Sequence, residues 1–100
     1  MTAEIKELDG KTVVTVSGEL DTLASEEFQK ALSPIMGKEG LQVEMDMADV
    51  SYISSKGLRV ILALAQSIMP SGGKLTVVNT TPPVRMVFDM SGFSTLFLAE

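Results

Sequence analysis

Apolar and polar residues follow one another along this chain in two periods, and the changes of period divide it into predicted strands and helices. Alternation with a period of two predicts strands with one buried face, whereas apolar positions three and four residues apart predict helices with one buried face. The predicted elements are strands at 5–8 and 12–16, a helix after residue 22, a strand at 41–47, a helix that begins at residues 54–55 and stops at Pro70, a strand at 74–78 and a helix from Pro82 to Ser91. A last short strand or helix is predicted from Phe93, Leu96 and Phe97.

Turn-forming residues mark several boundaries of these elements. Asp9 and Gly10 both tolerate a positive φ, so they predict a tight hairpin between the first two strands. Gly18 is predicted to end the second strand. Thr81 is predicted to cap the last helix, with Pro82 at its first position.

The alternation of strands and helices predicts the fold class. Strands that are separated by helices need crossover connections, so we predict an α/β fold with a mixed, partly parallel β-sheet covered by helices. The strand at 74–78 carries Leu75, Val77 and Val78, which predicts burial on both of its faces, as in a central strand. One hundred residues with 45% apolar side chains form one domain, residues 1–100, with a substantial core.

The junction between the third strand and the central helix is the segment around which the chain is organised. Ser54 and Ser55 stand where the helix cap belongs, directly before an apolar stripe. A serine oxygen can accept a hydrogen bond from a free N–H group of the first turn. The same N–H groups and the helix dipole also favour an anion, so a serine here is suited to carry a phosphate. Both interpretations, a simple cap and a phosphate acceptor, are open at this point.

Composition excludes several functional classes. Cysteine and histidine are absent, so disulfides, Ser-His or Cys-His nucleophiles and metal sites built on these residues are excluded. The net charge of −5 and the scattering of eight basic residues disfavour nucleic acid and membrane binding. Carboxylates such as Asp21, Asp46 and Asp49 are chemically able to act as acids or bases, but no histidine, cysteine, glycine-rich phosphate loop or metal-ligand cluster accompanies them. We therefore predict neither an enzyme nor a cofactor. Without a signal-peptide pattern or a bilayer-spanning stretch, the chain is predicted to be cytoplasmic.

The seven methionines allow two interpretations. Methionine is adaptable, so it serves both at promiscuous binding surfaces and as a filler of gaps in a core. We predict the core role for Met45, Met47, Met69 and Met86.

Four segments, taken in order and at natural spacing, resemble those of a STAS domain, the fold shared by sulfate transporter tails and anti-sigma-factor antagonists. These segments are 17–21 (Ser-Gly-Glu-Leu-Asp), 46–53, 54–58 (Ser-Ser-Lys-Gly-Leu) and 84–93. The resemblance covers nearly the whole chain and implies a STAS-type mixed sheet. It also implies a bacterial regulatory protein that binds an anti-sigma factor which is also a serine kinase, and thereby frees a sigma factor.

The resemblance further implies a phosphorylation switch. In the family the kinase uses ATP to phosphorylate a serine, which ends binding, and a serine phosphatase restores the protein. By position that serine is Ser55. The sequence departs from the family motif in that the preceding aspartate is Ser54 and the second hydroxyl residue is Lys56. The alternative is therefore a STAS scaffold that works without phosphorylation in a larger signalling or transport assembly.

The residues expected to contact the partner surround this serine. They are Asp21, Thr22, Ser54, Ser55, Lys56, Gly57 and Arg59. Each has a structural alternative. Asp21 and Thr22 also suit a helix cap, and Gly57 either allows a partner's backbone to approach or avoids crowding in the first turn. Lys56 and Arg59 are either contacts at the rim of an interface or solvated surface cations.

Overall fold

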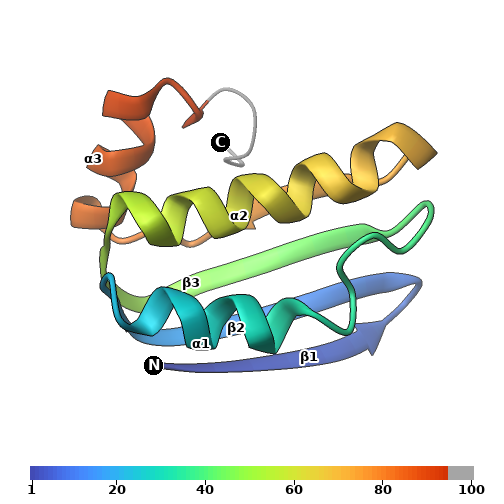
Figure 1. The fold of residues 1–100 in the computed structure, drawn as a ribbon, viewed down its shortest axis with the longest axis horizontal. Coiled ribbons are helices and arrows are strands. Elements are labelled where there is room, and N and C mark those ends of the chain that lie inside the picture. The colour runs from blue at the N-terminus through green and yellow to red at the C-terminus, as the bar shows by residue number, and fades with distance from the viewer. Residues whose placement is uncertain (95–100) are drawn as a thin grey trace.

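The structure, a computed structural model, describes residues 1–94 of the chain and confirms the predicted order of strands and helices (Figure 1). The elements are β1 (Thr2–Leu8), β2 (Lys11–Leu20), α1 (Ala24–Leu32), β3 (Gln42–Ile53), α2 (Ser55–Ile68), the 3₁₀ turn η1 (Met69–Ser71), β4 (Lys74–Val78) and α3 (Pro82–Ser91). Leu96 and Phe97, part of the predicted last apolar segment, lie outside the described residues.

The sheet is mixed, as predicted. Its strand order is β1-β2-β3-β4, with β1 antiparallel to β2 and the other two pairs parallel. The hairpin between β1 and β2 turns at Asp9 and Gly10, whose φ angles of 51° and 80° are those that a tight turn requires. The two crossovers pass through α1 and α2, so the carboxyl ends of β2 and β3 lie side by side at the end of the sheet where both helices begin (Figure 1).

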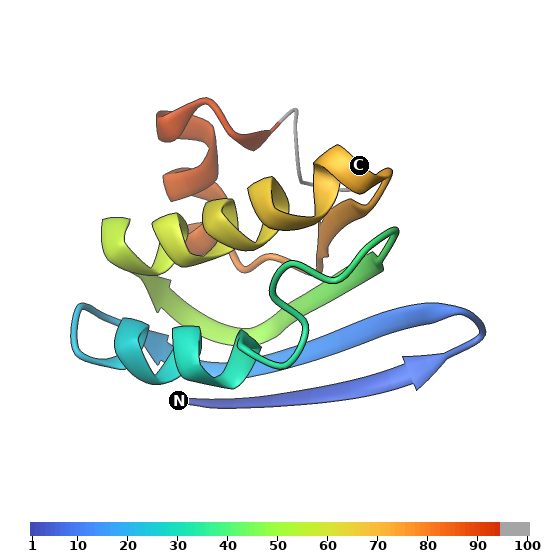
Figure 2. The ribbon, with the colours of Figure 1, turned by 45° about the vertical axis from the view of Figure 1, so that its right-hand side comes forward.

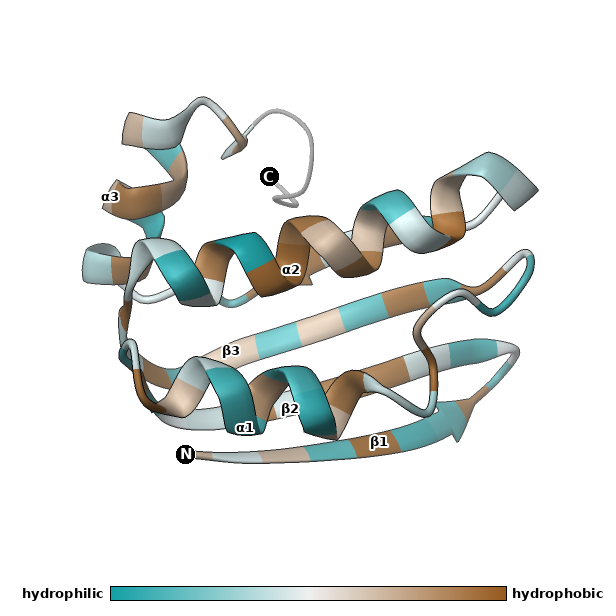
Figure 3. Ribbon diagram, in the orientation of Figure 1, coloured by the Kyte–Doolittle hydropathy of each residue, from teal (hydrophilic) through white to brown (hydrophobic). Residues whose placement is uncertain are grey.

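Helices cover one face of this sheet, and the core lies between the two layers (Figure 2). Apolar and polar positions alternate along the strands (Figure 3). The apolar positions of β2, such as Val14 and Val16, are buried, whereas Thr15 points to the exposed face. The largest fully buried side chains are Phe28 of α1 and Phe88 of α3. Within residues 1–94 no helix is both long and apolar enough to cross a lipid bilayer.

Two predictions about strands are wrong. β4 lies at the edge of the sheet within the described residues, where Leu75 and Val77 are buried but Val78 is only half-buried. Its nearly continuous apolar sequence therefore does not mark a central strand. Gly18 does not end β2, which continues to Leu20. With a φ of 97°, Gly18 instead sits where the pairing of β2 with β3 shifts register, and the strand bends there without stopping.

Two of the four methionines predicted to fill the core do so. Met45 and Met47 are fully buried, but the side chains of Met69 and Met86 are 54% and 60% exposed. Met69 lies beyond the end of α2, in η1. Met86 lies on the outer side of α3, because that helix turns Val84 and Phe88 toward the core. The core prediction is therefore wrong for these two residues.

Candidate functional site

The two serines at the start of α2 occupy different environments. Ser54 is buried, with 7% of its surface exposed, and its Oγ accepts a hydrogen bond of 3.1 Å from the backbone N–H of Gly57. It is the helix cap, with the extended backbone that a cap adopts. Ser55 is the first residue of the helix and is exposed. The cap is therefore provided by Ser54, and the hydroxyl group of Ser55 faces solvent at the positive end of the helix.

Gly57 joins the first turn of α2 to the ends of the strands below it. A Cβ atom at this position would lie 3.1 Å from both the carbonyl oxygen of Leu20 and Cγ1 of Ile53. The backbone N–H of Ser54 also donates to that Leu20 oxygen, at 2.8 Å. This close approach is enough to explain why residue 57 is a glycine, with no need for a contact to a binding partner. It also fixes the position of Ser55 relative to the end of β2.

The turn between β2 and α1 brings the next predicted residues to the same end of the molecule. Oδ1 of Asp21 accepts a hydrogen bond of 2.8 Å from the N–H of Ala24, so this carboxylate caps the turn that leads into α1. The carbonyl of Thr22 accepts from the hydroxyl of Ser25 at 2.6 Å. Asp21 therefore fastens the turn before α1, although the cap position of the helix itself is Leu23, and the side chains of both Asp21 and Thr22 are exposed.

Two cations lie on the α1 side of Ser55. Lys56 and Arg59 are exposed and line a groove between α1 and α2, which Glu26 of α1 also borders. Neither cation makes an ion pair within residues 1–94. Arg59 follows Ser55 by four residues, so the two side chains share one face of α2.

An apolar hollow lies on the α3 side of Ser55. Tyr52 of β3, Leu58 of α2 and Met90 of α3 line it together with Ser55 itself. Neither Tyr52 nor Met90 is among the residues that the sequence predicts to contact a partner. For Met90 a signal was present, because this residue lies off the buried stripe that Val84 and Phe88 form on α3, whereas no comparable pattern marks Tyr52.

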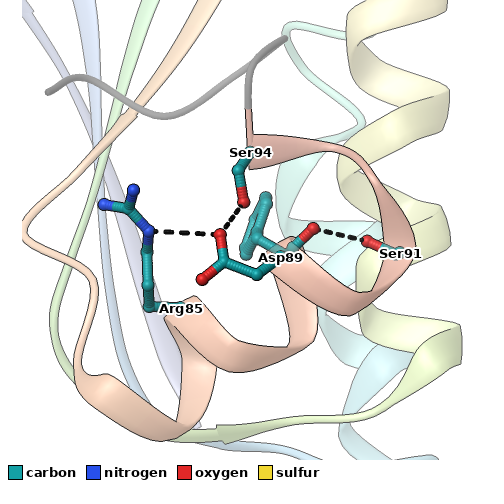
Figure 4. Close-up of polar contacts among 5 residues, drawn as sticks. Arg85, Asp89, Ser91 and Ser94 are labelled. Atoms are coloured by element: carbon teal, nitrogen blue, oxygen red, sulfur yellow. Dashed lines mark hydrogen bonds and ion pairs between the residues drawn. The ribbon is translucent and has the colours of Figure 1, made fainter.

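A polar cluster holds the end of α3. The carboxylate of Asp89 accepts hydrogen bonds from the hydroxyl of Ser94 and, at 3.4 Å, from Nε of Arg85 (Figure 4). The Ser94 hydrogen bond, aided by the charge of Arg85, lowers the pKa of Asp89 below its usual value of 3.8. Ser91 donates to the carbonyl of Phe88 at 3.0 Å. These bonds fasten the turn that follows α3 to the helix.

We expect the Asp89→Asn variant to be less stable than the wild type at neutral pH, and this difference in stability should disappear in acid. A carboxylate whose folded-state pKa is lowered stabilises the fold above its unfolded-state pKa, and that stabilisation disappears as the pH falls through the lower folded-state value. Thermal unfolding between pH 7 and about pH 2 measures the effect. The melting temperature of the variant should fall less steeply than that of the wild type below pH 3.8.

The control is Glu39→Gln, which removes a carboxylate that has no ion pair or hydrogen bond in the described part of the chain. This variant should follow the acid profile of the wild type. Profiles of equal steepness for the wild type and Asp89→Asn would contradict the role given to Asp89.

Comparison with known proteins shows one consistent similarity. The STAS domain family model matches residues 2–100. A Bordetella bronchiseptica protein named as a candidate anti-sigma factor antagonist, BtrV, is 31% identical over 97 residues, which cover 97% of this chain and 84% of that protein. The crystal structure of an anti-sigma factor antagonist from Mycobacterium paratuberculosis has a TM-score of 0.85 at 25% identity, covering 97% of this chain and 83% of the other. The phosphorylated form of the Bacillus cell fate determinant SpoIIAA shares the fold, with a TM-score of 0.73 at 21% identity over 99% of this chain and 92% of that one.

Proposed function

The chain belongs to the STAS domain family, and from this membership and the geometry around Ser55 we infer that it is an anti-sigma factor antagonist. It binds an anti-sigma factor that is also a serine kinase, and this binding frees a sigma factor. The kinase phosphorylates Ser55, the phosphorylated protein no longer binds, and a serine phosphatase reverses the change. The protein is thus regulatory and acts through contacts with other proteins. The observation that carries the proposal is the exposed hydroxyl of Ser55 beside a cap already provided by Ser54.

The proposed phosphate acts on the interface and leaves the fold intact. An anion at a helix N-terminus is locally stabilising by roughly 0.3–1 kcal/mol. A phosphate adds about −1.5 to −2 charges, and Arg59, one turn further along α2, is placed to pair with it. The same charge at a contact surface requires desolvation or meets repulsion, which costs a few kcal/mol of binding free energy.

The two departures from the family motif are compatible with this switch. Ser54 replaces an aspartate at a position where the structure needs a cap, and serine and aspartate are about equally good caps. Lys56 is exposed, and its charge favours a phosphate on the neighbouring residue. Neither change removes the hydroxyl group of Ser55 or buries it.

Intact-mass measurement, with peptide mapping, tests the proposal on protein isolated from its own cells during growth and under stress. We expect a population heavier by one phosphate, located on Ser55, whose fraction changes with the growth condition. The Ser55→Ala protein, expressed in the same cells, is the control and should show a single mass. An unmodified wild-type protein in every condition would instead favour the scaffold that works without phosphorylation.

A further inference from the structure

Exposed apolar side chains gather at one end of the molecule. The large apolar residues exposed within residues 1–94 are Leu8, Leu23, Tyr52, Met69, Met86 and Met90. Leu8 and Met69 lie at the far end, in the β1–β2 hairpin and in η1. The other four belong to the turn before α1, the end of β3 and the helix α3, which all lie at the left in Figure 1 with the start of α2. We call these four residues, Leu23, Tyr52, Met86 and Met90, the apolar end surface.

The apolar end surface borders Ser55. Met90, whose side chain is 81% exposed, lines the same hollow as Ser55 and Tyr52. Met86 is one turn earlier on α3, on the side that faces away from the buried Val84 and Phe88. The hydrogen bond from Ser54 N–H to the carbonyl of Leu20 joins the start of α2 to the end of β2, the strand that the turn with Leu23 follows. Ser55 therefore has apolar groups on its α3 side and the two cations Lys56 and Arg59 on its α1 side.

The residue types of the apolar end surface, three of which are tyrosine or methionine, are those common in protein-binding surfaces. Aromatic residues and methionine are enriched at the centres of protein interfaces, and methionine adapts its shape to a partner. Single apolar side chains scattered over a surface are ordinary, whereas apolar side chains gathered into one contiguous exposed patch mark an interaction site. Lys56 and Arg59, which make no ion pair within residues 1–94, add positive charge along the border of the surface.

We propose that the apolar end surface is the face on which the anti-sigma factor docks, through an apolar patch of its own that is bordered by acidic residues opposite Lys56 and Arg59. This inference rests on the proposed function and deepens it. The contact surface extends beyond the residues around Ser55 to the outer side of α3. A phosphate on Ser55 places a doubly charged group inside an apolar contact, where its lost hydration is not replaced.

Methionine oxidation tests this with the unaltered protein. The probe is the anti-sigma factor from the same organism that binds the purified wild-type chain. Dilute hydrogen peroxide oxidises exposed methionines, and peptide mass spectrometry follows each one with and without the probe. We expect the complex to slow oxidation of Met86 and Met90 and to leave Met69, similarly exposed at the far end, unchanged. Equal rates for Met90 in the free and bound protein would overturn the proposal.

Charge substitution gives an independent measurement. Met90→Glu should weaken binding at least about tenfold, as loss of a central contact does, whereas Met69→Glu should change it less than about twofold. Circular dichroism on both variants checks that they are folded, and a variant that fails to fold is replaced by Met90→Gln. Wild-type affinity in a folded Met90→Glu protein would overturn the proposal even where Ser55→Asp abolishes binding.

Two other outcomes identify a different occupant or a wider failure. A concentration-dependent dimer of the free chain that Met90→Glu dissociates would assign the surface to a second copy and overturn the proposal. Failure of every anti-sigma factor of the organism to bind the wild type would overturn the proposed function itself, and this inference with it.

Discussion

The Ser55→Asp variant is expected to bind the anti-sigma factor about a hundredfold more weakly than the wild type, which corresponds to about 2.7 kcal/mol. Ser55 lies between the apolar hollow and the two cations, so on the proposed mode of binding a carboxylate there enters the contact surface with the anti-sigma factor. Truncated or unpaired charges in such contacts cost a few kcal/mol. Isothermal titration calorimetry measures the affinity.

The stability of the Ser55→Asp variant should stay close to that of the wild type. Ser55 is exposed and begins α2, where a negative charge is favourable by roughly 0.3–1 kcal/mol. Urea unfolding measures this change. Ser55→Ala is the matched control, because it removes the hydroxyl group without adding charge and should keep its affinity within about twofold of the wild type. Unfolding of the domain by Ser55→Asp would contradict a phosphate that acts on the interface and leaves the fold intact.

The Phe88→Ala variant is expected to lose about 3–5 kcal/mol of unfolding free energy, the usual cost of removing a buried aromatic ring. Phe88 is fully buried, and with Val84 it provides the buried side of α3. Its carbonyl group also accepts a hydrogen bond of 3.0 Å from the N–H of Phe93. The loss is a large part of the 5–15 kcal/mol that holds an ordinary domain together.

Urea unfolding of Met86→Ala provides the comparison for Phe88→Ala. Met86 is on the same helix but exposed, so its removal should change the unfolding free energy by no more than about 0.5 kcal/mol. Equal losses in the two variants would show that α3 does not dock through Phe88. Because α3 also carries Met90, we expect Phe88→Ala to weaken partner binding as well.

The sequence predicts the local features of the fold well, because they depend on neighbouring residues. The hairpin at Asp9 and Gly10 and the cap at Ser54 follow from the backbone preferences of those residue types. The position of Thr81 at the start of α3 is also confirmed. Its hydroxyl group, however, donates to the carbonyl of Val50 in β3 at 2.7 Å, a distant partner that no local pattern reveals.

Features set by long-range packing could not be predicted in the same way. The edge position of β4 depends on strand order, which the apolar content of Leu75 and Val77 does not specify. The exposure of Met86 depends on which side of α3 turns to the core. For the same reason the sequence did not single out the exposed Leu23, Tyr52 and Met90, which come from three separate segments, and the predicted role of Ser55 stays a prediction.

Among the strands that the structure describes, the two outer ones carry features that oppose pairing with another chain. β1 exposes the charged side chains of Glu4, Lys6 and Glu7, and β4 is only five residues long and begins with an exposed lysine, Lys74. A long, flat, apolar edge offers free backbone groups to a strand from another molecule, and charge and shortness both hinder this addition. We therefore expect both edges of the sheet to resist the addition of a strand from another chain, so that association of this protein takes place through side-chain surfaces and not through backbone pairing.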